Sequence, residues 1–106
     1  IYHGNGGVFG IGSCLTTGVT GVLRKKFSAS NFWRECIEYD CTAFMYVGEL
    51  VRFLVNQPTS SLDKQHKVRL ALGNGLRKNV WQEFSERFRV RCVEFYAASE
   101  GNCIMV

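Results

Sequence analysis

The sequence is 106 residues long, 46% of these residues are hydrophobic, and the formal net charge is +4. These values fit one small globular domain, and they exclude a disordered, collagen-like or low-complexity chain. Basic side chains are mostly mixed with acidic ones, which is typical of a solvated surface, so we expect no nucleic acid partner.

The N-terminal part of the chain is apolar but rich in glycine and threonine. Residues 8–23 contain four glycines and three threonines, and Arg24-Lys25-Lys26 follows them. A membrane span needs a run of about 18 apolar residues or more, and this sequence has none. We therefore predict a core helix that leads into a short strand over residues 20–23.

The middle of the chain alternates between helical and strand patterns. Apolar residues recur on one helical face over residues 32–37, and Ser28 or Ser30 can cap this helix. A near-continuous apolar run over residues 42–47 is typical of a strand covered on both faces.

The second half of the chain continues the alternation. We predict a helix over residues 50–54, a polar surface loop over 56–66, a strand over 68–72, an amphipathic helix from Leu76 to Phe88 and a last strand over 92–96.

Alternating strands and helices predict an α/β fold, with a parallel sheet, right-handed crossovers and helices on both faces. The sequence begins at Ile1 without an initiator methionine and ends in the apolar run 104–106. We therefore expect the chain to be part of a larger domain.

Three loops would follow the strands at one edge of this sheet, at residues 46–49, 73–76 and 96–100. Ligands of open α/β sheets bind beyond the carboxyl ends of the strands, so we expect a site at this edge.

The loop Tyr96-Ala97-Ala98-Ser99-Glu100 is the most informative of the three. The tyrosine can stack on a planar base, Ser99 can donate to a phosphate, and Glu100 can hold Mg²⁺ near that phosphate. An ordinary turn with a solvated Glu100 is equally consistent with the local chemistry.

The segment Gly73-Asn74-Gly75 would let the backbone approach a flat or anionic ligand closely. Such turns are also common as tight connections, and this one matches neither the dinucleotide nor the P-loop pattern. His3 by itself is more often a packed or capping residue than a catalytic one, and we expect His66 to be solvated.

The five cysteines are an odd number without close pairs. We expect them to be small buried side chains in a reducing compartment, and we predict no zinc site. They are Cys14, Cys36, Cys41, Cys92 and Cys103.

Four stretches of the sequence carry recognisable motifs. They are YHGNGGVFGIG, VLRKKFSASNFWREC, YVGELVRFLVNQP, and the segment from HKVRLALGNGLRKNVWQEF to RF and EFYAASEGN. Together they span nearly the whole chain, and they resemble the fatty acid transport protein and very-long-chain acyl-CoA synthetase family of adenylate-forming enzymes. The patterns KKFSAS-x-FW and Y-x-GE-x-x-R-x-L are specific to that family.

This resemblance implies that residues 1–106 form part of an AMP-binding (adenylation) domain, with no complete second domain. It implies a ligase that uses ATP, Mg²⁺ and CoA to activate a long-chain or very-long-chain fatty acid, through an acyl-AMP intermediate, with a link to fatty acid uptake. The phosphate loop should precede Ile1 and the mobile C-terminal domain should follow Val106, so this piece alone should be inactive.

The resemblance also implies residue roles. Tyr96 would lie against adenine, Ser99 near the AMP phosphate and Glu100 on Mg²⁺, which makes Ser99 and Glu100 the catalytic residues. The remaining expected roles are nucleotide binding by Gly73, Asn74, Gly75 and Ala97, and an acyl pocket lined by His3, Tyr46 and Gly48.

Two positions depart from the superfamily motif Y-G-x-T-E. Ala97 replaces its glycine, and Ser99 replaces its threonine but keeps the hydroxyl. Two alternatives stay open: a non-catalytic fatty acid transport or binding protein with the same fold, and a plain α/β nucleotide-binding module. We expect membrane association through parts outside this chain, with a cytosolic active site at the endoplasmic reticulum, plasma membrane or peroxisome.

Overall fold

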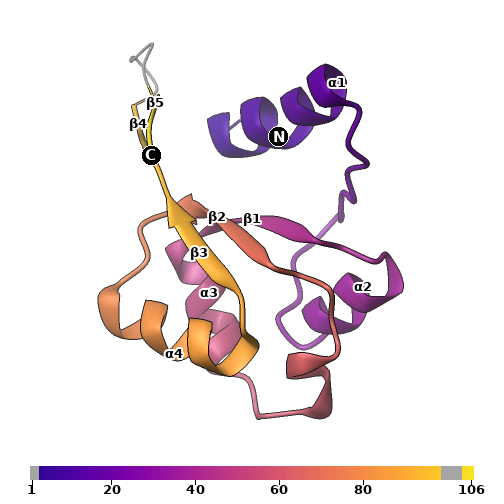
Figure 1. Ribbon diagram of the computed structural model, residues 1–106, viewed down its shortest axis with the longest axis vertical. Coiled ribbons are helices and arrows are strands. Elements are labelled where there is room, and N and C mark those ends of the chain that lie inside the picture. The colour runs from indigo at the N-terminus through magenta and orange to yellow at the C-terminus, as the bar shows by residue number, and fades with distance from the viewer. Residues whose placement is uncertain (1–2, 99–103) are drawn as a thin grey trace.

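The computed structural model describes residues 3–98 and 104–106, and it has the expected alternation of strands and helices (Figure 1). The elements are η1 (Asn5–Gly12, a π-helix), α1 (Ser13–Thr17), α2 (Phe32–Glu38), β1 (Ala43–Val47), α3 (Gly48–Val55), η2 (Ser61–Lys64, a 3₁₀-helix), β2 (Leu70–Asn74), α4 (Lys78–Phe88), β3 (Arg91–Glu94), β4 (Tyr96–Ala97) and β5 (Ile104–Met105).

Strands β1, β2 and β3 form a parallel sheet in chain order, which confirms the predicted α/β class. Helix α3 connects β1 to β2, and α4 connects β2 to β3. Because right-handed crossovers between neighbouring strands in chain order put their helices on the same face, α3 and α4 pack together there (Figure 1).

The core lies between this face of the sheet and the helices. Val51 and Leu54 of α3 and Phe84 of α4 are fully buried, as their helical spacing predicts. Trp33 of α2 joins them, with its ring centroid 4.6 Å from that of Phe88. The apolar stripes of the three helices therefore meet in one cluster.

The opposite face of the sheet is less covered by the described residues. Met45, Leu72 and Val93 are in register across the three strands, and all three are half-buried. Within residues 3–98 and 104–106, the predicted helices thus cover one face of the sheet.

The N-terminal segment differs from the prediction of a core helix and a strand. Residues 5–17 are helical, but some of their apolar side chains face solvent, with Val8 62% and Leu15 82% exposed. Gly18, at φ +73°, ends α1, and residues 20–23 have no strand partner among the described residues. A strand is stable only when paired, so an apolar run by itself does not produce one.

Smaller corrections concern element ends and His66. Asn31 precedes α2 at the cap position, while Ser28 and Ser30 bond to each other at 3.2 Å. The sequence predicted a solvated His66, but this residue is half-buried, because its ring stacks on Trp33 with centroids 4.1 Å apart. Burial there lowers the pKa of His66.

The final strand also divides in two. The predicted strand over residues 92–96 ends at Glu94 as β3, and β4 (Tyr96–Ala97) then pairs antiparallel with β5. No helix in the described part of the chain is long and apolar enough to cross a membrane.

Candidate functional site

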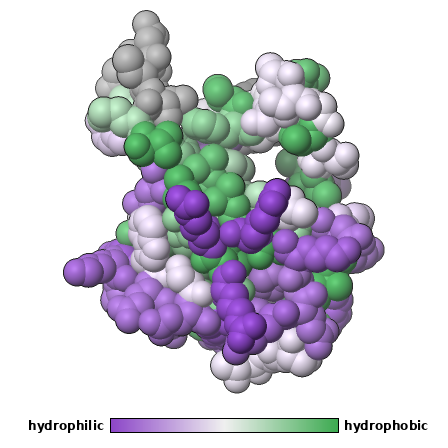
Figure 2. Space-filling model, in the orientation of Figure 1, coloured by the Kyte–Doolittle hydropathy of each residue, from purple (hydrophilic) through white to green (hydrophobic). Residues whose placement is uncertain are grey.

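The carboxyl ends of β1, β2 and β3 meet at the upper edge of the sheet, below the N-terminal helices (Figure 1). The three loops predicted to carry the site all begin there. Figure 2 shows hydrophobic side chains gathered around this edge, whereas hydrophilic side chains cover most of the lower half of the molecule. An apolar surface next to strand ends suits a ligand with apolar parts.

A cleft of about 470 Å³ opens at this edge, within the range of about 300–1,000 Å³ that is usual for small-molecule sites. Its lining includes four of the residues expected to bind nucleotide, and Tyr96 is 65% exposed, so its ring is free to stack on a ligand. The lining residues are Asn74, Gly75, Glu94, Phe95, Tyr96 and Ala97.

Gly73 is buried below the cleft instead of lining it. The ring of Tyr46 packs against Gly73, since a Cβ added there would lie 2.7 Å from two ring atoms. The missing side chain at Gly73 therefore makes room for Tyr46. Gly75 lies at the cleft with φ +75°, a conformation that favours glycine.

Tyr46 and Gly48, expected in the acyl pocket, lie at the end of β1. The Tyr46 side chain is 1% exposed, and its hydroxyl donates to Glu94 Oε1 at 3.3 Å. Burial, together with the carboxylate of Glu94, raises the pKa of Tyr46. Gly48 touches the glycine loop, because a Cβ on Gly48 would collide with the Gly75 carbonyl group.

His3 and Asn5 connect the N-terminal segment to this edge. The Asn5 side-chain amide donates to the Tyr46 carbonyl oxygen at 3.0 Å, and the Asn5 N–H donates to His3 Nδ1 at 3.2 Å. The ring of Phe9 packs on Phe95, with centroids 4.6 Å apart. His3 thus lies exposed beside the end of β1, on the segment that borders the cleft.

Ser99 and Glu100, the expected catalytic and magnesium-binding residues, lie outside the described residues. Within residues 3–98 and 104–106, no group of three or more His, Cys, Asp or Glu side chains is placed to hold a metal ion. Of the described cysteines, Cys36 and Cys92 are buried, and Cys14 and Cys41 are half-buried. Burial raises the pKa of Cys36 to about 12, so its thiol stays protonated.

Sequence reasoning missed Glu94 and Phe95 as lining residues. The available signal was Glu94 itself, the one charged residue within the predicted strand over residues 92–96. Its contacts depend on residues 46 and 76, which are distant in the sequence. Only the sheet register brings them together.

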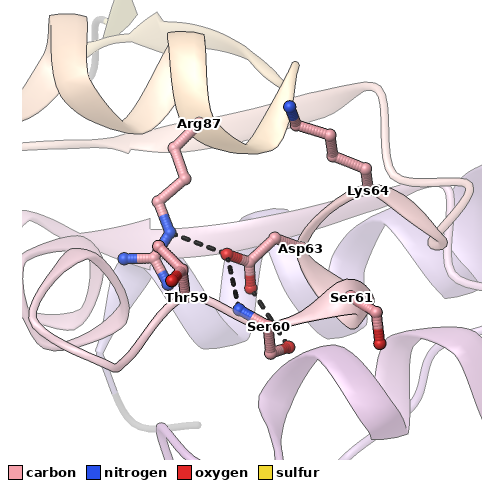
Figure 3. A pocket seen from close by; sticks show the side chains of 6 residues that line it. All are labelled: Thr59, Ser60, Ser61, Asp63, Lys64 and Arg87. Carbon is pink, nitrogen blue, oxygen red and sulfur yellow. Dashed lines mark hydrogen bonds and ion pairs between the residues drawn. The ribbon is translucent and has the colours of Figure 1, made fainter.

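A second, smaller hollow lies under α4 and is lined by Thr59, Ser60, Ser61, Asp63, Lys64 and Arg87 (Figure 3). Arg87 Nε donates to Asp63 Oδ2 at 2.8 Å, and its other nitrogens donate to the carbonyl oxygens of Val55, Gln57 and Pro58. Four of the five guanidinium N–H groups therefore hold the loop, which makes this hollow structural.

Comparison with known proteins identifies the family of this chain. The family model described as AMP-binding enzyme matches residues 1–106. Long-chain fatty acid transport protein 1 from Homo sapiens is 55% identical over 104 residues, covering 97% of this chain and 16% of that protein. Long-chain fatty acid transport protein 6 from Mus musculus is 49% identical over 107 residues, covering 100% of this chain and 17% of that protein.

The fold is shared with a benzoate CoA ligase from Burkholderia xenovorans LB400, whose crystal structure aligns with a TM-score of 0.71 and 18% identity, over 82% of this chain and 18% of that one. The present chain therefore spans only about a sixth of the length of the proteins that it resembles. By the family match over its whole length, it belongs to the AMP-binding enzyme family.

Proposed function

We propose that this chain is part of the adenylation domain of an ATP-dependent long-chain or very-long-chain fatty acid–CoA ligase that is linked to fatty acid uptake. The observation that carries this proposal is the cleft at the carboxyl edge, where Asn74, Gly75, Tyr96 and Ala97 come together in a chain of the AMP-binding family. The fatty acid substrate is suggested by relatives that are called long-chain fatty acid transport proteins.

In the proposed reaction, the fatty acid carboxylate attacks the α-phosphate of ATP to give acyl-AMP and pyrophosphate. The thiolate of CoA then displaces AMP and forms the thioester. The protein has to stabilise charge on phosphate more than to supply a nucleophile, which suits backbone N–H groups, one hydroxyl and one carboxylate that would hold Mg²⁺.

The described residues fit the adenosine part of this substrate. The exposed ring of Tyr96 offers a stacking surface, and the backbone of Asn74 and Gly75 allows a flat base to approach closely. We assign the phosphate contact to Ser99 and the Mg²⁺ contact to Glu100. Magnesium would neutralise phosphate charge there.

The acyl group would lie at the end of β1. His3 and Gly48 are at the surface of this region, whereas Tyr46 is buried and would support the pocket from below. Membrane association would come from parts of the protein outside this chain, and the active site would face the cytosol at the endoplasmic reticulum, plasma membrane or peroxisome.

The test is fatty-acid-dependent exchange of pyrophosphate into ATP by the full-length protein, measured for the wild type, for Glu100→Ala and for the control Glu83→Ala. Glu83 is an exposed carboxylate of α4. We expect exchange that requires a long-chain acid, survives in the control and is lost in Glu100→Ala.

The names of the relatives favour one other candidate, a transport or binding protein that captures a fatty acid without turnover. A folded full-length protein that binds fatty acid but shows no exchange in any variant would support that candidate and refute the ligase.

A further inference from the structure

Tyr46, Gly73 and Glu94 occupy one row across the three parallel strands, since Tyr46 is in register with Gly73, and Gly73 with Glu94. Side chains in one row point to the same face, and two strand spacings separate the outer positions by about 9.5 Å. A tyrosine can bridge that distance only by lying across the middle strand. Gly73 permits this because it has no side chain to meet the ring.

The row ends at a single carboxylate oxygen that serves two donors. Glu94 Oε1 accepts the Tyr46 hydroxyl at 3.3 Å and the Leu76 backbone N–H at 2.6 Å. Leu76 precedes α4, so this N–H lies in the loop that follows Gly75. Hydrogen bonds to an ionised acceptor are short and stronger than neutral ones, and the bond from Leu76 has that character.

The loop held in this way is part of the wall of the cleft. Asn74 and Gly75 line it, and Glu94 lines it from the neighbouring strand. Gly75 has φ +75° and makes contact with the start of α3 at Gly48. A glycine in this conformation has wide backbone freedom, so a fixed loop shape requires an anchor beside it.

We propose that Glu94 is a positioning residue for the nucleotide cleft. Its carboxylate fixes the position of the Leu76 N–H, and thereby the shape of Asn74-Gly75. The Tyr46 ring crosses over Gly73, and its hydroxyl holds the carboxylate in place. Glu94 acts through the loop and not on the reacting atoms.

This role rests on the function proposed above, so the test begins with a measurement that needs no ligand. Hydrogen exchange is followed in the full-length protein, in a peptide that contains Gly75 and Leu76. Glu94→Met keeps the length of the side chain and removes the acceptor, Glu94→Gln keeps an acceptor, and Glu83→Gln is the matched control at an exposed site.

We expect at least about tenfold faster exchange at Leu76 in Glu94→Met, and a change within about threefold in Glu94→Gln, because a neutral acceptor keeps part of the bond. Exchange in the second half of α4 should not change. Tyr46→Phe keeps the ring over Gly73 and should cause a smaller change in the same direction. If Glu94→Met does not fold, Tyr46→Phe becomes the deciding variant. Unchanged hydrogen exchange at Leu76 in Tyr46→Phe would then refute the positioning role of Glu94.

The kinetic reading separates positioning from a purely structural role. Glu94→Met should raise KM for ATP about tenfold and change kcat less, with Glu94→Gln close to the wild type. Wild-type exchange at Leu76 and a wild-type KM in Glu94→Met would overturn the proposal. It would also be overturned if Glu94→Gln raised KM for ATP as much as Glu94→Met, because that result would point to a direct effect of charge on the ligand. If the wild type shows no adenylation, the proposed function fails while the Leu76 measurement still decides the role of Glu94.

Discussion

Replacing Arg87 with methionine is expected to destabilise the protein by about 3–5 kcal/mol, because it breaks a buried ion pair by removing one partner. Asp63 is 6% exposed and would keep its carboxylate in the interior without the guanidinium at 2.8 Å. The N–H and hydroxyl of Ser60 still donate to this carboxylate, which places the cost at the lower end of that range.

The carbonyl groups around Arg87 add to this cost. Its terminal nitrogens donate to the carbonyl oxygens of Val55 at 2.7 Å, Gln57 at 2.9 Å and Pro58 at 3.0 Å. These contacts fix the chain between α3 and η2. Arg87→Lys keeps the charge but cannot reach all three oxygens with one ammonium group, so we expect about half of the loss.

The assay is chemical unfolding of the full-length protein, together with hydrogen exchange over residues 55–65. Lys64→Met is the matched control, since Lys64 is an exposed cation in the same hollow. The double variant Asp63→Leu/Arg87→Met should cost less than Arg87→Met alone, because no charge remains buried. If the free energy of unfolding of Arg87→Met lay within about 0.5 kcal/mol of wild type, the usual range for surface changes, the reasoning would be refuted.

Two other predictions concern the glycine loop and His66. Gly75→Val places a branched side chain at φ +75°, which should cost about 1–3 kcal/mol and lower the affinity for ATP in calorimetry; unchanged nucleotide binding would show that the loop is wrongly assigned. His66 has a pKa lowered by burial, so the unfolded state binds a proton first, and stability should fall as pH decreases below about 6.5 toward the folded pKa. His66→Phe keeps the stack on Trp33 and should remove this part of the pH dependence of the unfolding midpoint, and an unaltered dependence would assign it to other groups.

Much of the fold could be predicted from local patterns. The apolar spacing in α3 and α4 and the continuous run in β1 each belong to one short segment, and their periods differ because helices and strands turn their side chains differently. The alternation of these segments then restricts the sheet to a parallel order. The structure confirms these elements within a few residues at each end.

The N-terminal segment could not be predicted in this way. Its apolar residues suggested a core helix and a strand, yet Val8 and Leu15 are exposed, and residues 20–23 are not a strand. Burial and strand pairing depend on what lies beside a segment. An apolar composition does not contain that information.

For the candidate site, the loops with unusual chemistry could be located from the sequence, because glycine, tyrosine and small residues follow the predicted strands there. The role of each residue depends on contacts that form only in the folded chain. Gly73 leaves room for the ring of Tyr46, and Glu94 joins residues 46 and 76 through one oxygen atom. Those contacts are set by the register of three strands, and hydrogen bonds that span up to 48 residues of sequence arise from packing and not from local pattern.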